Sequence, residues 1–247
     1  MNDDALLRRL VAIAGVVPEL FQFASPAAAS QYRLLYRLFR RHVPAGAEVL
    51  DWGAGWGHFS WWLAHAGYRP CAFVFSAGED FLLRPWMPKD GWRQVRGESA
   101  DPVRLPLPDA SFDAVASIGT LEHVRETGGT ELGSLREVAR ILRPGGVFVC
   151  YHFPNRWSWI DAVAQRLGRD HHVWRYTRAD IETLVRGAGL SLLDVRRYAF
   201  LPRNGCGRLP SPLRGSRGVA AAWDALDGLL QLVGSPLCHN YAFIARR

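Results

Sequence analysis

The residues best placed to do chemistry lie where a short apolar segment runs into three glycines. Asp51 closes the apolar segment, and Gly53, Gly55 and Gly57 follow at alternate positions. Glycine allows a sharp turn and a close approach of the backbone to a ligand, because a Cβ would collide or force an unfavourable positive φ. The pattern predicts a nucleotide-like cofactor at the mouth of a parallel sheet, with the Asp51 carboxylate available to a cationic group. The dinucleotide fingerprint G-x-G-x-x-G would need a glycine where the chain has His58, which argues against a nicotinamide dehydrogenase.

The elements that must position this loop alternate between helices and strands. Apolar spacing predicts strands at 47–51, 72–75, 94–97, 112–118, 147–151, 190–200 and 241–245. Helices are expected at 4–14, after residue 30, at 58–67, around 135–142, at 177–189 and at 220–232, with a loop at 202–218. Strands that alternate with helices indicate an α/β fold with a parallel, doubly covered sheet.

The bulk composition excludes several classes of protein. A chain of 247 residues, 49% of them hydrophobic, is long enough for one well-buried domain. The net charge is +7, but the basic residues are scattered and include a single lysine, Lys89, so a nucleic-acid groove is disfavoured. No apolar run approaches the ~20 residues of a membrane span. The four cysteines form no C-x-x-C pair, which favours reduced thiols in the cytoplasm over a zinc site or disulfides.

Several blocks downstream of the glycines occur together in a recognisable order. They are LPLPDASFDAV at 105–115, LEHV at 121–124, the segment 135–146, HVWRYT at 172–177 and NYAFIAR at 240–246. Over residues 46–247 the chain resembles the class I S-adenosylmethionine-dependent methyltransferases of the ubiquinone-biosynthesis-like type. The resemblance implies a doubly wound, mostly parallel seven-stranded sheet with the final strand antiparallel. Residues 1–45 are then a helical lid or edge on the methyltransferase domain at 46–247.

The resemblance also implies where S-adenosylmethionine would bind. Asp51, Gly53, Gly55 and Gly57 match the positions that contact the amino-acid half and the sugar of the cofactor. Gly119 would pass its backbone beside the methionine moiety.

The nucleoside end of the expected cofactor site contains one departure from the family pattern. Glu98 and Ser99 match the segment that meets the adenine, with Glu98 or Asp101 accepting from its amino group. The family usually ends its second strand with an acid that accepts both ribose hydroxyls, and the matching residue here is Ser76. A serine makes a weaker, neutral hydrogen bond. Either Glu79 takes the place of that acid or cofactor affinity is reduced.

Because a sulfonium is already electrophilic, the protein need only hold a nucleophile in line with the methyl group and remove its proton. Histidine suits the second task because its pKa lies near neutrality. The candidates are His123, His152, His171 and His172, with Tyr176 as a further hypothesis and core packing as its alternative role. His152 and His172 are preferred, because in the family the segments after strand five face the ligand crevice.

Residues that the chain contains, and motifs that it lacks, limit the chemical class of the methyl acceptor. Trp157, Trp159 and Trp174 lie where the family builds acceptor pockets, and flat apolar walls suit an aromatic, sugar or polyketide-like molecule. The same rings could instead pack a helix onto the core. The sequence after the fourth strand lacks the Pro-Pro-aromatic motif of enzymes that methylate exocyclic amines. Gly119 stands where some relatives have a metal-binding glutamate before the Glu-His pair, so no metal is expected.

We therefore predict an enzyme that transfers a methyl group to an oxygen, or less readily a carbon, of a small metabolite. An RNA methyltransferase is the alternative that the positive charge favours. A relative that binds the cofactor without turnover is the alternative that Ser76 favours.

Overall fold

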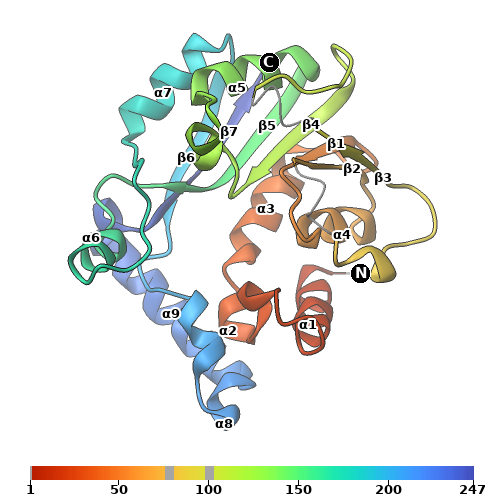
Figure 1. Cartoon of the computed structure of the whole chain (residues 1–247). Helices are drawn as coiled ribbons and strands as arrows, with labels where there is room; N and C mark the ends of the chain where they lie inside the picture. The colour runs from red at the N-terminus through yellow and green to blue at the C-terminus, as the bar shows by residue number, and fades with distance from the viewer. Residues whose placement is uncertain (1, 76–80, 98–102) are drawn as a thin grey trace.

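A mixed seven-stranded sheet runs through the centre of the part of the chain that the structure describes (Figure 1). The structure is a computed structural model that describes residues 2–75, 81–97 and 103–247. The strand order is β3-β2-β1-β4-β5-β7-β6. The strands are β1 (Glu48–Trp52), β2 (Arg69–Val74), β3 (Arg93–Arg96), β4 (Phe112–Ile118), β5 (Leu142–Pro154), β6 (Ser191–Tyr198) and β7 (Asn240–Arg246). β7 runs antiparallel between β5 and β6, and the other neighbours pair in parallel, which confirms the predicted fold class.

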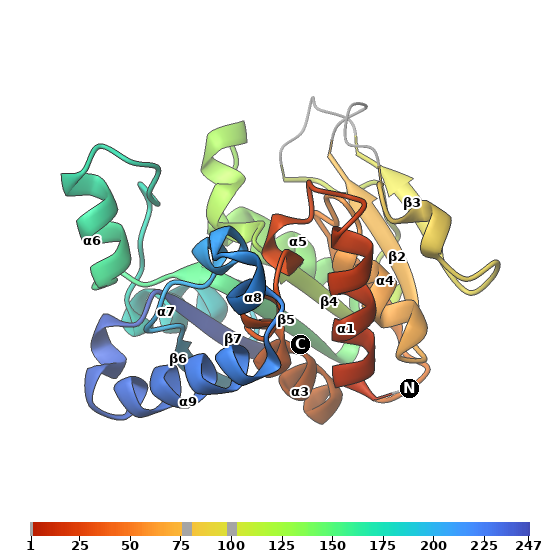
Figure 2. The same cartoon turned by 90° about the horizontal axis from the view of Figure 1, so that it is seen from below.

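Helices cover both faces of this sheet. One face carries α5 (Glu131–Ile141) and α7 (Arg178–Gly187), and the other carries α1 (Asp3–Ala14), α3 (Tyr32–His42) and α4 (His58–His65) (Figures 1 and 2). The remaining helices are η1 (Phe21–Phe23), α2 (Pro26–Ala29), η2 (Arg84–Trp86), η3 (Leu121–Thr127), α6 (Trp159–Arg166), η4 (Asn204–Arg208), α8 (Ser211–Arg214), α9 (Arg217–Gly234) and η5 (Ser235–Leu237).

The two faces divide the core according to the alternation of side chains along each strand. Val49 of β1 joins the cluster under α1, α3 and α4, whereas its neighbour Leu50 joins the cluster under α5 and α7. Val149 and Phe148 of β5 divide in the same way. Because both faces are covered, the central strands are apolar at nearly every position, as parallel sheets require.

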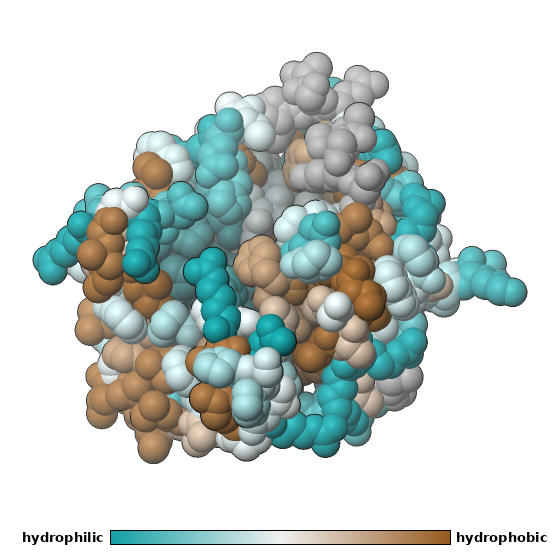
Figure 3. Space-filling model, turned by 60° about the horizontal axis from the view of Figure 1, so that its bottom comes forward, coloured by the Kyte–Doolittle hydropathy of each residue, from teal (hydrophilic) through white to brown (hydrophobic). Residues whose placement is uncertain are grey.

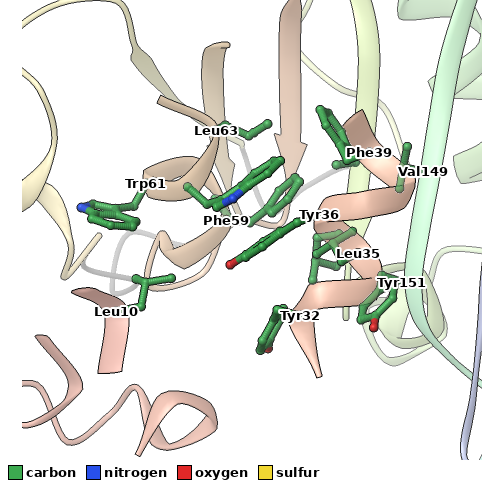
Figure 4. Close-up of a cluster of buried hydrophobic side chains, with 14 of the residues drawn as sticks. Leu10, Tyr32, Leu35, Tyr36, Phe39, Phe59, Trp61, Leu63, Val149 and Tyr151 are labelled. Atoms are coloured by element: carbon green, nitrogen blue, oxygen red, sulfur yellow. The ribbon is translucent and has the colours of Figure 1, made fainter. Parts of the chain in front are cut away.

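The N-terminal helices share a core with the sheet through stacked aromatic rings. Tyr36 of α3 stacks on Trp62 of α4 with ring centroids 4.2 Å apart, and Phe59 of α4 lies 5.4 Å from the same indole. Figure 4 shows Tyr36 and Phe59 within this cluster. Tyr151 of β5 packs in the same cluster and donates a hydrogen bond to the carbonyl of Gln31 at 2.6 Å. The start of α3 therefore lies at the same end of the sheet as the carboxyl end of β5.

Two segments are more ordered than the sequence pattern predicts. β5 begins at Leu142 rather than 147, because Leu142 pairs with Phe112 before an irregularity in the β4–β5 register. The expected loop at 202–218 contains η4 and α8, and α9 starts directly after Ser216, whose side chain caps the helix by accepting from the amide of Val219.

α9 leaves an apolar stripe on the surface. Leu229, Leu232 and Val233 are 64%, 81% and 85% exposed. Hydrophobic residues gather at the lower left of the face drawn in Figure 3, where α9 lies. Within the described ranges, none of the helices combines the length and the hydropathy needed to cross a bilayer.

Candidate active site

The site lies at the edge where the parallel strands end. β1, β4 and β5 are in register there, since Trp52 pairs with Ser117 and Ser117 pairs with Cys150. The antiparallel β7 begins at the same edge, because Asn240 pairs with Pro154 at the end of β5. Residues that follow three strands and precede a fourth therefore meet at one place.

The glycine loop after β1 adopts a backbone that other residues rarely take. Gly53, Gly55 and Gly57 have φ values of 74°, 50° and 93°. A Cβ on Gly53 would lie 2.3 Å from Oγ1 of Thr120, and a Cβ on Gly57 would lie 2.4 Å from the ring of Phe81. Gly55 is different, because nothing lies within 4 Å of its Cβ position. Gly53 and Gly57 thus let the loop close on its neighbours, while Gly55 leaves backbone open to a ligand, as a cofactor cradle requires.

Asp51 is a buried carboxylate at the root of this loop. It is 1% exposed, and Oγ of Ser60 donates a hydrogen bond to it at 2.7 Å. Burial raises the pKa of Asp51 to about 7, against the opposing effect of Ser60. No cation pairs with this carboxylate among the residues described. A cationic group such as the ammonium of an amino acid would satisfy it, so the loop fits the cofactor that the sequence implies.

A cavity of about 520 Å³ opens beside Gly119 at the end of β4. It lies under the N-terminal segment, since Phe21 and Tyr32 line it together with residues that follow β4, β5 and β6. Five histidines of the described chain line it: His58, His123, His152, His172 and His239. The structure thus brings the two preferred histidines, His152 and His172, to one cavity.

His152 is held in an unusual backbone conformation at the end of β5. Its φ is 69°, a value that non-glycine residues seldom adopt. The hydroxyl of Tyr198 fixes it, because the amide of His152 donates to that oxygen at 2.8 Å and Nδ1 lies 3.0 Å from it. Burial, together with the smaller effect of nearby histidines, lowers the pKa of His152 to about 3. This imidazole is therefore neutral and weakly basic.

His172 instead has a carboxylate partner. Nδ1 of His172 lies 3.2 Å from Oδ1 of Asp161, which is 2% exposed and also accepts from the amide of His172. Nδ1 of His239 lies 3.3 Å from the other oxygen of Asp161. Burial raises the pKa of Asp161, but hydrogen bonds from His172 and the close contact with His239 outweigh burial and hold that pKa well below its usual value. The Asp161 carboxylate is therefore charged, and it orients both rings.

The other candidates from the sequence occupy varied surroundings. Tyr176 stacks on Phe153 in the core and donates a hydrogen bond to Glu131. His123 contacts Glu126 at 2.8 Å, and Nδ1 of His171 lies 2.9 Å from the carbonyl of Arg169.

The three tryptophans after β5 do not pack together on the core. Trp157 is 58% exposed, and Trp174 is 46% exposed beneath the guanidinium of Arg125. Trp159 donates a hydrogen bond to the carbonyl of Phe200 at 2.8 Å. Trp174 lines a smaller cavity beside the first.

The nucleoside end of the predicted cofactor site falls in the segments 76–80 and 98–102. Ser76, Glu98 and Ser99, with the alternatives Glu79 and Asp101, lie outside the described residues.

Sequence reasoning missed Asp161, His239 and His58. His239 directly precedes β7, and an antiparallel last strand must start where the parallel strands end, so its position was recoverable from the predicted topology. Asp161 lies in the first turn of α6, where an acid is ordinarily interpreted as a favourable charge at a helix start. His58 was considered only as the residue that breaks the dinucleotide fingerprint. It packs against Phe23, and burial lowers its pKa to about 4.

Comparisons with known proteins agree with this geometry. Residues 50–150 match the family described as "Methyltransferase domain". The demethylmenaquinone methyltransferase of Deinococcus radiodurans is 32% identical over 208 residues, which cover 76% of this chain and 76% of that protein. The methyltransferase GfsG of Streptomyces halstedii is 29% identical over 221 residues, with 84% and 78% covered.

The solved structures are similar in fold. The 1,6-didemethyltoxoflavin-N1-methyltransferase of Burkholderia thailandensis, which holds 1,6-didemethyltoxoflavin and S-adenosylhomocysteine, superposes with a TM-score of 0.51 at 19% identity and covers 99% of this chain and 79% of its own. Together with the glycine loop and the strand order, these likenesses show that the chain belongs to the class I S-adenosylmethionine-dependent methyltransferases and uses S-adenosylmethionine as its methyl donor.

Proposed function

We propose that this methyltransferase transfers the methyl group in line to an oxygen of a small acceptor, with His172 as the general base. The observation that carries the proposal is the contact of 3.2 Å between Nδ1 of His172 and Oδ1 of Asp161 at the wall of the cavity beside Gly119. A carboxylate that holds one ring nitrogen selects the tautomer in which the other nitrogen accepts a proton.

S-adenosylmethionine, when bound, supplies an electrophilic methyl group on a sulfonium. The residues of the chain then orient the acceptor and remove its proton. Nε2 of His172 takes the proton of the acceptor hydroxyl as the oxygen attacks, and the buried charge of Asp161 stabilises the imidazolium that results. A positioned base of this kind contributes typically ~10² to 10⁴-fold to the rate.

His152, the other histidine predicted to be catalytic, is assigned a different part. With a pKa lowered to about 3 by burial, it stays neutral and cannot hold a transferred proton at ordinary pH. Tyr198 fixes its Nδ1, so its ring orientation is set. We assign His152 a hydrogen bond that orients the acceptor oxygen toward His172.

The lining of the cavity favours a neutral, largely apolar acceptor with a hydroxyl group. Phe21, Tyr32, Ile118 and Leu201 supply apolar walls, and no carboxylate is among the described residues that line it. A cationic amine acceptor would find no counter-charge there, whereas an aromatic, sugar or polyketide-like hydroxyl would find histidine partners. The N-terminal segment, residues 1–45, forms part of this wall and is proposed as its cover.

We also propose that the protein is cytoplasmic. All four cysteines of the chain are free and buried, as suits a reducing compartment.

The test compares His172→Gln with His171→Gln, because the neighbouring His171 bonds only to a carbonyl of its own loop. Both proteins are titrated with S-adenosylhomocysteine by calorimetry and then assayed with a panel of phenols, sugars and hydroxylated polyketides. We expect His172→Gln to lower kcat by ~10² to 10⁴-fold with unchanged S-adenosylhomocysteine affinity. Equal turnover in the two variants would rule out His172 as the base.

A further inference from the structure

A second cavity of about 300 Å³ adjoins the first and shares His123, His172 and His239 with it. Its wall also contains two almost fully buried acids, Asp161 at 2% exposure and Glu122 at 3%. The two cavities thus meet at a set of imidazoles and carboxylates that come from η3, α6 and the segments before α7 and β7.

The donor atoms of three of these residues are spaced as metal ligands. Nδ1 of His172 is 3.2 Å from Oδ1 of Asp161, and Nδ1 of His239 is 3.3 Å from Oδ2. One donor atom from each of the three residues lies within 4.8 Å of the others. Charge-assisted hydrogen bonds between such groups are usually shorter, about 2.7–2.9 Å. Ligands about 2.0–2.1 Å from a tetrahedral zinc ion lie about 3.3 Å apart, which matches both contacts.

A second observation points to a cation at the same place. Oδ2 of Asp161 is a buried atom without a hydrogen-bond partner in the described chain. Glu122, His123 and His172 form another group of donor atoms within 4.8 Å of one another, so the two groups share His172. A buried, charged carboxylate oxygen without a donor is costly, and a bound cation would satisfy that of Asp161.

We propose that Asp161, His172 and His239 bind a first-row transition metal ion such as Zn²⁺, and that metal occupancy and proton acceptance by His172 exclude each other. The donor set selects the metal, because imidazole favours zinc and its neighbours over magnesium or calcium. The ligands Asp161 and His239 do not belong to the Glu122-His123 pair, which the sequence analysis found to lack the metal-binding glutamate at position 119. Ser158, whose Oγ is 3.0 Å from Nδ1 of His239, would give up that contact.

The consequence for catalysis rests on the proposed function. A metal on Nδ1 of a neutral imidazole leaves the ring proton on Nε2. His172 then donates into the cavity and cannot take the proton of an acceptor. Because the neutral ring carries a single proton, zinc binding at Nδ1 moves that proton to Nε2 by exchange with solvent, with no net release and no other reactant, so a chelator reverses it.

The test measures binding apart from activity. The full chain is stripped with EDTA and titrated with Zn²⁺ against a chromophoric chelator, beside His239→Gln and the control His171→Gln, whose residue lines the same cavity outside the donor set. Co²⁺ gives a second readout through the visible absorption of a tetrahedral site. We expect one equivalent of Zn²⁺ on the wild type and the control, and a loss of at least ~100-fold in affinity for His239→Gln, since even outer partners of a metal site cost 10- to 100-fold.

Thermal melts confirm that each variant is folded before the titration is interpreted. Absence of stoichiometric binding to the wild type, or equal binding to His239→Gln, would overturn the site. Methyl transfer that is lost in proportion to bound zinc, and restored by EDTA, supports the exclusion. Turnover that rises with zinc would overturn the exclusion and the base role of His172 while leaving the metal site in place.

Discussion

Asp51 should couple cofactor binding to pH. Its carboxyl is 1% exposed and receives a hydrogen bond from Ser60, and burial raises its pKa to about 7. In the complex, the ammonium of the methionine half would keep Asp51 ionised, so its pKa must fall on binding. Below pH 7 the free protein carries a proton there that the complex lacks. Binding therefore releases a proton, and affinity falls as the pH is lowered.

The magnitude follows from the size of the shift. If the pKa drops from about 7 to about 4 or below, the dissociation constant rises roughly 15-fold between about pH 7 and about pH 5.5. That change corresponds to ~1.6 kcal/mol of binding free energy. The ammonium of the ligand, with a pKa of about 7.7–8.0, stays protonated throughout this interval. Two other buried groups of the site do not change their protonation in this interval. Burial lowers the pKa of His58 to about 4, so it stays neutral, and raises the pKa of Glu122 to about 8, so it stays protonated.

The assay is calorimetric titration with S-adenosylhomocysteine at several pH values, in buffers of different ionisation enthalpy so that proton release is counted directly. Asp51→Asn is the matched control, because the amide keeps the shape and cannot titrate. We expect the wild type to show the slope and the variant to bind more weakly at pH 7 with a nearly flat dependence. A flat wild-type profile, or the same slope in Asp51→Asn, would refute the assignment of Asp51 to the ammonium.

Two further predictions concern the glycine loop and the anchoring of α9. Gly57→Ala should cost ~2–4 kcal/mol of unfolding free energy in urea, because its Cβ would lie 2.4 Å from the ring of Phe81 at φ 93°. Gly55→Ala meets nothing within 4 Å, so it should cost only ~1–2 kcal/mol yet weaken S-adenosylhomocysteine binding roughly 10-fold; unchanged affinity would place the cofactor elsewhere. Arg203→Met should cost ~3–5 kcal/mol by leaving the 3%-exposed Asp227 unpaired, and the added change Asp227→Leu should recover most of the loss. A single variant as stable as the wild type would contradict that account.

The sequence predicted the fold and the cofactor loop because both depend on short-range rules. The apolar run that ends at Asp51 predicted the strand at 47–51, and the structure places its Val49 and Leu50 on opposite faces of the sheet. The spacing of Gly53, Gly55 and Gly57 signalled the positive φ values that the loop adopts. The pattern did not show that Gly55 faces open space while the other two glycines pack against side chains. The contacting side chains, such as Phe81, belong to other segments of the chain.

The histidines show the limit of that reasoning. Sequence position and the family resemblance singled out His152 and His172 as facing the crevice, and both line one cavity. Only the tertiary structure separated them, because Tyr198 and burial make His152 a weak base, whereas Asp161 arrives from α6 to hold His172. His239 joins the same carboxylate from the far end of the chain.

What the sequence determined by itself was therefore the order of elements and the class of sheet, since both follow from periodicity and steric limits within a few residues. The contacts of the cofactor with Asp51 and the glycine loop stay a prediction that the family resemblance supplies. What only the tertiary structure decided was which imidazole has a charged partner. Basicity and metal affinity depend on burial and on atoms 3–4 Å away through space, and the residues that supply those atoms are separated by up to 78 positions along the chain, from Asp161 to His239.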